Sequence, residues 1–135
     1  MALKWYTVVV DCHDPQAQAR WWAEALDWQI VHDTPEEAVA IPKGMGAEPV
    51  AELEAWFARG QGLVFVPVPE GKTVKNRLHI DLAPHTSQDR DAEIARLESL
   101  GATRVNVGQD EADVTWTVLA DPEGNEFCVL SSRNR

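Results

Sequence analysis

One order of secondary-structure signals occurs twice along this chain, and the repetition limits the folds it can adopt. In each half a β-branched run precedes a helix signal, and three more apolar runs follow, separated by turn residues. The first half predicts elements at 4–11, 14–26, 29–33, 38–42 and 62–68. The second half predicts them at 77–83, 88–100, 103–107, 114–119 and 125–130. The sequence therefore predicts two βαβββ modules.

The two halves align at the ends of their first strands. Laying Val-Val-Val-Asp (8–11) on Leu-His-Ile-Asp (78–81) superposes Asp11 on Asp81. We expect an α/β protein of the α+β kind, with curled mixed sheets that together form a cup. A chain of 135 residues suits one compact domain. The predicted domain spans 1–135, with module one at about 1–69 and module two at about 75–135.

The helix of the first half has a clear start signal. Asp14 is suited to the N-cap and Pro15 to the first helical position. Four side chains at helical spacing should face the sheet, and Trp21 lies about a third of a turn away. The four are Ala19, Trp22, Ala23 and Leu26.

The first half departs from the second in two places. Asp27 stands at the helix stop where the second half has Gly101, which predicts a strained or differently shaped turn. An insertion at 48–58 carries an apolar helical stripe of Val50, Leu53 and Phe57, with Trp56 beside it. The insertion is interpreted as a surface helix covering the sheet edge. A lid hinged at the flanking glycines is the alternative.

Charge and cysteine content narrow the classes of partner. Twelve Lys and Arg against 22 Asp and Glu give a net charge of −10, which opposes binding to nucleic acid or an anionic membrane surface. No apolar stretch is long enough to span a membrane, and the N-terminus does not resemble a signal peptide. Cys12 and Cys128 form no close metal-binding or redox pair. We expect both to be reduced and partly buried, and the protein to be cytoplasmic.

Three stretches carry a resemblance to a known family. They are Asp14-Pro15 opening a Trp-rich helix, 72–82 (Lys-Thr-Val-Lys-Asn-Arg-Leu-His-Ile-Asp-Leu) and 120–130 (Ala-Asp-Pro-Glu-Gly-Asn-Glu-Phe-Cys-Val-Leu). Together they resemble the glyoxalase-like branch of the vicinal oxygen chelate superfamily, which includes lactoylglutathione lyases, extradiol dioxygenases and bleomycin resistance proteins. The resemblance covers nearly the whole chain. It implies paired modules around a cup, a divalent metal on up to four ligands, and a homodimer.

The family's metal ligands carry over only in part. His79 takes the first-strand place of the second module, and Glu126 takes the last-strand place. In the first module, Val9 stands where a ligand is expected. Val64 stands opposite Glu126 when Val-Phe (64–65) is aligned with Glu-Phe (126–127). Because catalytic metal sites usually have three protein ligands, two ligands predict weak metal binding.

Strand periodicity gives the same residues another use. His79, Asp81 and Arg77 share one face of their strand, while Leu78, Ile80 and Leu82 point to the opposite, helix-packed face. His79 and Asp81, together with Asp11 and Glu126, form the polar floor of the predicted cup. The alternatives remain open: Asp11 and Asp81 satisfy backbone amides or pair with Arg77, and His79 and Glu126 form a hydrogen-bonded pair.

Aromatic side chains supply candidate walls for the cup. Six Trp in 135 residues is a high content, and small-molecule pockets typically combine aromatic walls with a few polar groups. Core packing accounts for most aromatics, and we expect two or three to reach a ligand. The candidates are Trp5, Trp28, Trp56, Phe65, Trp116 and Phe127.

The leading hypothesis is a glyoxalase-like protein that binds a small aromatic or apolar molecule without strong metal dependence and without a cofactor. His79 and Glu126 would hydrogen-bond the ligand's polar end, and they are the candidate catalytic pair if a proton transfer occurs. The role would be resistance to, or sequestration of, a toxic molecule. The rival hypothesis is a metal-dependent lyase, isomerase or dioxygenase holding Zn, Mn, Ni or Fe on His79 and Glu126.

Overall fold

The computed structural model describes residues 3–106 and 115–135. The chain divides into two compact units, Met1–Gly71 and Lys72–Arg135, and each is described by itself. Among the described residues, no helix has the length and apolar character needed to cross a membrane. The prediction that both modules form one cup concerns the placement of the units and stays a prediction.

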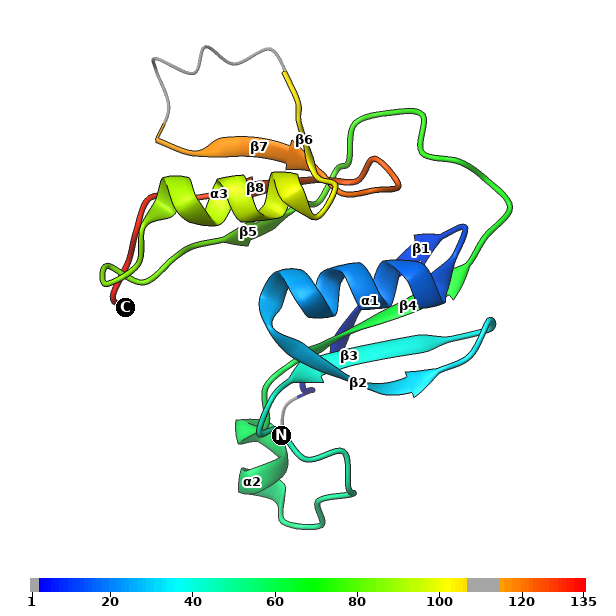
Figure 1. The fold of residues 1–135 in the computed structure, drawn as a ribbon. Coiled ribbons are helices and arrows are strands. Elements are labelled where there is room, and N and C mark those ends of the chain that lie inside the picture. Colours follow the sequence, from blue (N-terminus) through cyan, green and yellow to red (C-terminus); the bar gives the residue numbers. More distant parts are fainter. Residues whose placement is uncertain (1–2, 107–114) are drawn as a thin grey trace. The chain divides into compact units, whose positions relative to one another are not determined.

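The first unit is a helix packed on a four-stranded mixed sheet (Figure 1). The strands lie in the order β1-β4-β3-β2; β1 pairs in parallel with β4, and the other neighbours are antiparallel. In chain order the elements are β1 (Thr7–Cys12), α1 (Pro15–Leu26), β2 (Trp28–Asp33), β3 (Ala38–Pro42), α2 (Leu53–Ala58) and β4 (Gly62–Pro67).

Helix α1 begins and ends where the sequence predicts. The Asp14 side chain accepts a hydrogen bond from the Ala17 backbone N–H at 3.1 Å, and Pro15 occupies the first turn. At the other end Asp27 adopts the left-handed conformation, with φ 55°. Its backbone N–H donates to the carbonyls of Ala23 and Glu24 and closes the helix. Asp27 therefore occupies the left-handed position at the helix end that is usually taken by glycine.

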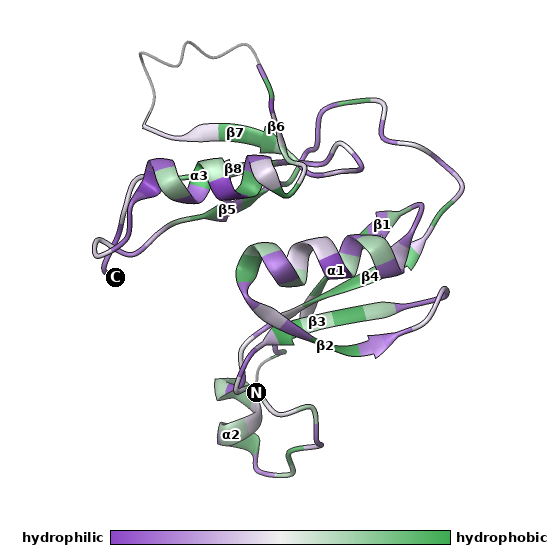
Figure 2. Cartoon of the chain, in the orientation of Figure 1, coloured by the Kyte–Doolittle hydropathy of each residue, from purple (hydrophilic) through white to green (hydrophobic). Residues whose placement is uncertain are grey.

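The core of the first unit lies between α1 and the sheet. Ala19, Trp22 and Ala23 are buried as predicted, and Trp21 is buried too, against Trp22 in an edge-to-face contact with ring centroids 5.1 Å apart. Alternation along β4 buries Leu63 and Phe65. Strand β3 is coloured mostly green in Figure 2, which marks it as hydrophobic.

The insertion forms a shorter helix than predicted. Helix α2 covers only Leu53–Ala58, so Val50 lies outside it. No residue of α2 is buried, and Leu53 is 67% exposed, so the stripe does not pack on the sheet edge. The Lys4 ammonium donates to the carbonyls of Trp56 and Arg59 and lies over the Trp56 ring. These contacts tie α2 to the segment before β1.

The second unit repeats the first. Its sheet order is β5-β8-β7-β6, with β5 parallel to β8 and the other pairs antiparallel. The Asp89 side chain caps α3 by accepting from the N–H groups of Asp91 and Ala92, and Ile94 and Leu97 are buried as predicted. The elements are β5 (Ile80–Leu82), α3 (Arg90–Ser99), β6 (Thr103–Arg104), β7 (Thr117–Ala120) and β8 (Glu126–Val129).

Strand β5 is shorter than the predicted strand at 77–83. Leu78 precedes the strand and is 88% exposed, so the prediction that it packs under a helix is wrong. Alternation holds only from Ile80 onward, because only there does β8 fix the backbone. The predicted end of the strand at 103–107 and the predicted start of the strand at 114–119 lie outside the described residues.

The two sheets share one register. In the first unit Val10 pairs with Phe65, and in the second Ile80 pairs with Phe127. These pairs are equivalent in the predicted alignment of the halves. The alignment that sets Val64 against Glu126 is therefore supported by strand pairing.

The turn before β8 is built around one buried carboxylate. Asp121 Oδ1 accepts from the N–H groups of Glu123 and Asn125, at 2.9 and 3.1 Å. Gly124 closes the turn with φ 90°, and its N–H donates to the Asp121 carbonyl. Glu126 is thereby set at the first position of β8.

We predict that Asp14→Ala lowers the free energy of unfolding by about 0.5 to 2 kcal/mol, because the N-cap of α1 is lost. Urea unfolding of the full chain measures it. Asp14→Asn keeps a capping oxygen and should stay within about 0.5 kcal/mol of wild type. Equal losses in both variants would contradict the capping account.

Candidate functional site

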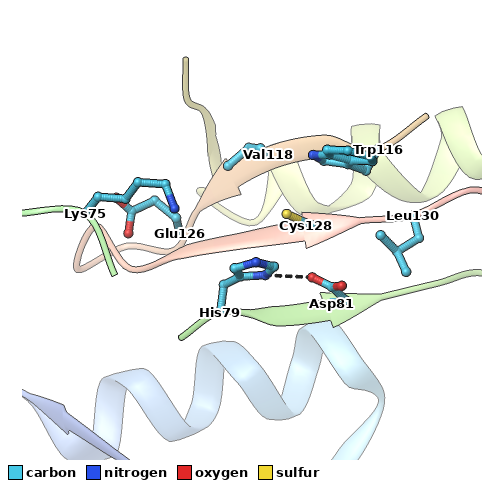
Figure 3. Close-up of a pocket in the computed structure, with 8 residues that line it drawn as sticks. All are labelled: Lys75, His79, Asp81, Trp116, Val118, Glu126, Cys128 and Leu130. Carbon is cyan, nitrogen blue, oxygen red and sulfur yellow. Dashed lines mark hydrogen bonds and ion pairs between the residues drawn. The ribbon is translucent and has the colours of Figure 1, made fainter. Parts of the chain in front are cut away.

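A cavity of about 300 Å³ opens on one face of the second unit's sheet (Figure 3). Glu126 and Cys128 alternate toward it along β8, while Phe127 and Val129 are buried on the other face. The lining residues are Lys75, His79, Asp81, Trp116, Val118, Glu126, Cys128 and Leu130. This set is called the β5–β8 pocket.

His79 and Asp81 form a hydrogen-bonded pair in this pocket. The distance from His79 Nδ1 to Asp81 Oδ1 is 2.7 Å, and both side chains are a little under half exposed (Figure 3). With the proton on Nδ1, the other ring nitrogen, Nε2, keeps a lone pair. The pair can therefore accept a proton or a hydrogen bond from a ligand.

Glu126 is held by partners other than His79. Its carboxylate pairs with the Lys72 ammonium at 3.1 Å and accepts from the Asn76 backbone N–H at 3.2 Å. Burial alone would raise the pKa of Glu126. Hydrogen bonds from its own backbone, Asn76 and Lys72, with the Lys72 charge, outweigh burial and lower that pKa below 4.5. The alternative of a His79–Glu126 pair is thus replaced by two separate pairs.

Cys128 is a buried thiol on the same face. Burial raises the pKa of its thiol, and the charge of Asp81 and a hydrogen bond to it raise the pKa further. A nucleophilic cysteine needs a lowered pKa, so this environment does not activate Cys128 as a nucleophile. Cys12 and Cys128 are both free thiols and buried.

The family-type ligand set does not fit a metal here. The Glu126 oxygens already bind Lys72 and Asn76, and Val9 and Val64 carry no donor atoms. Within the described part of the chain, another group has ligand atoms within 4.8 Å of one another: His79, Asp81 and Cys128.

The first unit has a groove on the equivalent face of its own sheet. Its volume is about 710 Å³, and Val9, Val64 and Trp56 line it as predicted residues. Apolar side chains such as Tyr6, Val39 and Ile41 complete much of the wall. This surface is called the unit 1 groove.

Six predicted site residues line neither cavity: Trp5, Asp11, Trp28, Phe65, Arg77 and Phe127. Phe65 is 0% exposed, because it alternates with Val64 and faces the core. Trp5 is 69% exposed, and Asp11 and Arg77 are exposed as well. Asp81 pairs with His79, which answers the alternative of pairing with Arg77.

Sequence reasoning missed Lys72, Lys75 and Cys128. Strand periodicity could have found Cys128, which lies two residues after Glu126 on the same face. The two lysines precede β5, and no local pattern indicates that Lys72 pairs with a residue 54 positions away.

Comparisons with known proteins place the chain in a family. The model of the glyoxalase-like domain matches residues 7–130. The chain belongs to the glyoxalase-like domain family. No curated protein matches its sequence.

Solved structures share the fold of this glyoxalase-like protein at low identity. A glyoxalase/bleomycin resistance protein/dioxygenase family enzyme from Burkholderia phytofirmans is 14% identical, with TM-score 0.67, covering 97% of this chain and 100% of the other. A mutant of the fosfomycin resistance protein FosX from Listeria monocytogenes, complexed with Mn(II) and 1S,2S-dihydroxypropylphosphonic acid, is 9% identical, with TM-score 0.67 and coverages of 98% and 93%. A glyoxalase-related enzyme from Fulvimarina pelagi is 15% identical, with TM-score 0.64 and coverages of 97% and 89%. The predicted fold class, α+β with two four-stranded mixed sheets, is confirmed.

We predict that Lys72→Met lowers the free energy of unfolding of this glyoxalase-like protein by about 1 to 2 kcal/mol at pH 7, because the Glu126 carboxylate is left poorly exposed and without its cation. The lowered pKa of Glu126 means that the pair stabilises fully above pH 4.5 and less as pH falls through the folded-state pKa. The difference between wild type and variant should therefore shrink in acid.

Urea unfolding at pH 7 and in acid tests this. The matched control is Lys43→Met, whose ion pair with Asp27 is exposed and should contribute less than about 0.5 kcal/mol. If both variants lost the same free energy of unfolding, the Lys72–Glu126 pair would contribute no more than the exposed Lys43–Asp27 pair, and the prediction would be wrong.

Proposed function

We propose that the chain binds a small molecule with an aromatic or apolar body and one polar group in the β5–β8 pocket. The proposal rests on one observation: the lining of this cavity combines apolar surface with polar atoms. Trp116, Val118 and Leu130 offer apolar surface, and His79 and Lys75 offer polar atoms. Its volume of about 300 Å³ suits a small ligand.

The polar end of the ligand meets His79. Asp81 orients the imidazole, so His79 presents one defined ring nitrogen to a ligand hydroxyl or acid. Lys75 adds a cation at the pocket wall, and Glu126 adds an anion fixed by Lys72. A ligand with both a proton to give and an acceptor is the best match.

The same arrangement supports a proton transfer. A histidine held by a carboxylate is a common general base. In this proposal His79 takes the proton and Asp81 positions it. Glu126, already ionised and paired, contributes charge.

The apolar body of the ligand packs against Trp116. The unit 1 groove, with Val9, Val64 and Trp56, is a second apolar surface for ligands of the same class. A resistance or sequestration role fits a protein that holds an apolar molecule, and one similar structure is described as a fosfomycin resistance protein. We further propose a cytoplasmic homodimer; buried free thiols suit a reducing compartment.

A metal enzyme on His79 and Glu126 is the weaker proposal. Glu126 would have to leave Lys72 and Asn76 before it could coordinate an ion. We therefore propose ligand binding without an ion on this pair.

We predict that Trp116→Ala weakens binding of 8-anilinonaphthalene-1-sulfonate, an aromatic anion used as probe, by about 5- to 30-fold, or 1 to 2 kcal/mol. Fluorescence titration of chelator-treated protein measures the affinity. Trp5→Ala is the matched control, because Trp5 is exposed and lines neither cavity. Its affinity should equal that of wild type.

Three results would count against the proposal. Equal affinities of wild type, Trp116→Ala and Trp5→Ala would show that the probe does not bind in the β5–β8 pocket. Loss of binding on chelator treatment alone would show that an ion is required. A loss in Trp56→Ala instead of Trp116→Ala would place the probe in the unit 1 groove.

A further inference from the structure

Lys75 is the cation in the lining of the β5–β8 pocket, and the two carboxylates of that lining already have partners. Asp81 is hydrogen-bonded to His79 at 2.7 Å. Glu126 pairs with the Lys72 ammonium at 3.1 Å. Within residues 3–106 and 115–135, the Lys75 ammonium takes part in no hydrogen bond or ion pair. The pocket therefore contains a positive charge that the described part of the protein does not pair.

The segment that carries Lys75 is fixed to strand β8 on both sides of this residue. Lys72, which precedes it, pairs with the Glu126 carboxylate. Asn76, which follows it, donates from its backbone N–H to the Glu126 carboxylate at 3.2 Å and from its side-chain amide to the Glu126 carbonyl at 3.3 Å. These contacts limit where the Lys75 ammonium can lie. A cation placed in advance loses less conformational entropy when it binds a ligand.

The Lys75 side chain is directed into the pocket. Figure 3 shows it extending from the segment before β5 toward the other lining residues, with its nitrogen at the inner end. Its charge also acts on Cys128 of β8. Burial and Asp81 raise the pKa of the Cys128 thiol, and the charge of Lys75 opposes them. The positive charge is therefore felt in the space that a ligand would fill.

We propose that Lys75 selects ligands that carry an anionic oxygen group, such as a carboxylate or a sulfonate, on their aromatic or apolar body. The inference rests on the proposed function and deepens it, because it gives the ligand's polar group a charge. A hydrogen bond from an ammonium to an anionic oxygen is stronger than one between neutral groups. His79 accepts a proton or a hydrogen bond from a hydroxyl or N–H group of the same ligand.

The groups that line the pocket decide this preference, although the whole chain has a net charge of −10. At physiological ionic strength, charges in solvent are screened beyond about 8 Å. A cationic ligand would have to compete with His79 for Asp81, or with Lys72 for Glu126. An anionic ligand meets Lys75 without breaking a contact of the protein. The local arrangement therefore favours an anion.

Two fluorescent probes that differ in charge test the proposal on the full chain. One is 8-anilinonaphthalene-1-sulfonate, and the other is N-phenyl-1-naphthylamine, the same aromatic amine without the sulfonate. Lys75→Met removes the cation and keeps an unbranched side chain. This change should weaken binding of the sulfonate probe by about three- to tenfold, because an exposed charged contact is lost. Binding of the neutral probe should be unchanged.

Two further variants separate the position of the charge from the total charge. Arg77→Met is the matched control, because Arg77 is exposed, carries the same charge and lines neither cavity. It should leave the affinity for both probes unchanged. Lys75→Arg keeps a cation and should retain most of the affinity for the sulfonate probe. Added salt should reduce the difference between wild type and Lys75→Met, because an exposed ion pair is screened.

Three outcomes would overturn the anion preference. Lys75→Met could bind the sulfonate probe as tightly as wild type, it could lose affinity for both probes equally, or Arg77→Met could lose as much affinity as Lys75→Met. In each case a loss of the neutral probe in Trp116→Ala would still support the proposed function. If neither probe bound wild type saturably, the proposed function would fail and the anion preference with it.

Discussion

The parallel pairing of β5 with β8 determines the candidate site. Ile80 lies beside Phe127, and Phe127 is fully buried. Because side chains alternate along a strand, a buried Phe127 forces Glu126 and Cys128 to the opposite face. A slip of one residue would bury the polar groups and expose the aromatic ring, so the hydrophobic core fixes the chemistry of the pocket.

The first unit shows what the same register does with other residues. Phe65 takes the buried place of Phe127, and Val9 and Val64 take the places of His79 and Glu126. The face that is polar in the second unit is apolar in the first. One scaffold therefore carries two kinds of surface, and the difference lies in a few positions that do not affect the core.

Local signals predicted the helices well. Asp14 and Pro15 fixed the start of α1. His79 lies beside Asp81 as the shared face predicted, although His79 itself precedes β5. The same alternation, applied to β4, excludes Phe65 from the face of Val64, so the prediction that both contact ligand was inconsistent from the start. The pairing of Lys72 with Glu126 could not be predicted, because it joins residues 54 positions apart and depends on where the loop before β5 runs.

The central claim is that the β5–β8 pocket is the binding face of the molecule. NMR of the ¹⁵N-labelled full chain, titrated with 8-anilinonaphthalene-1-sulfonate, tests it most directly, because each backbone amide and each Trp indole gives its own signal. The account predicts that the Trp116 indole and the amides of 126–130 shift with a common binding curve. Shifts confined to the first unit, or no saturable shift in the second, would contradict it.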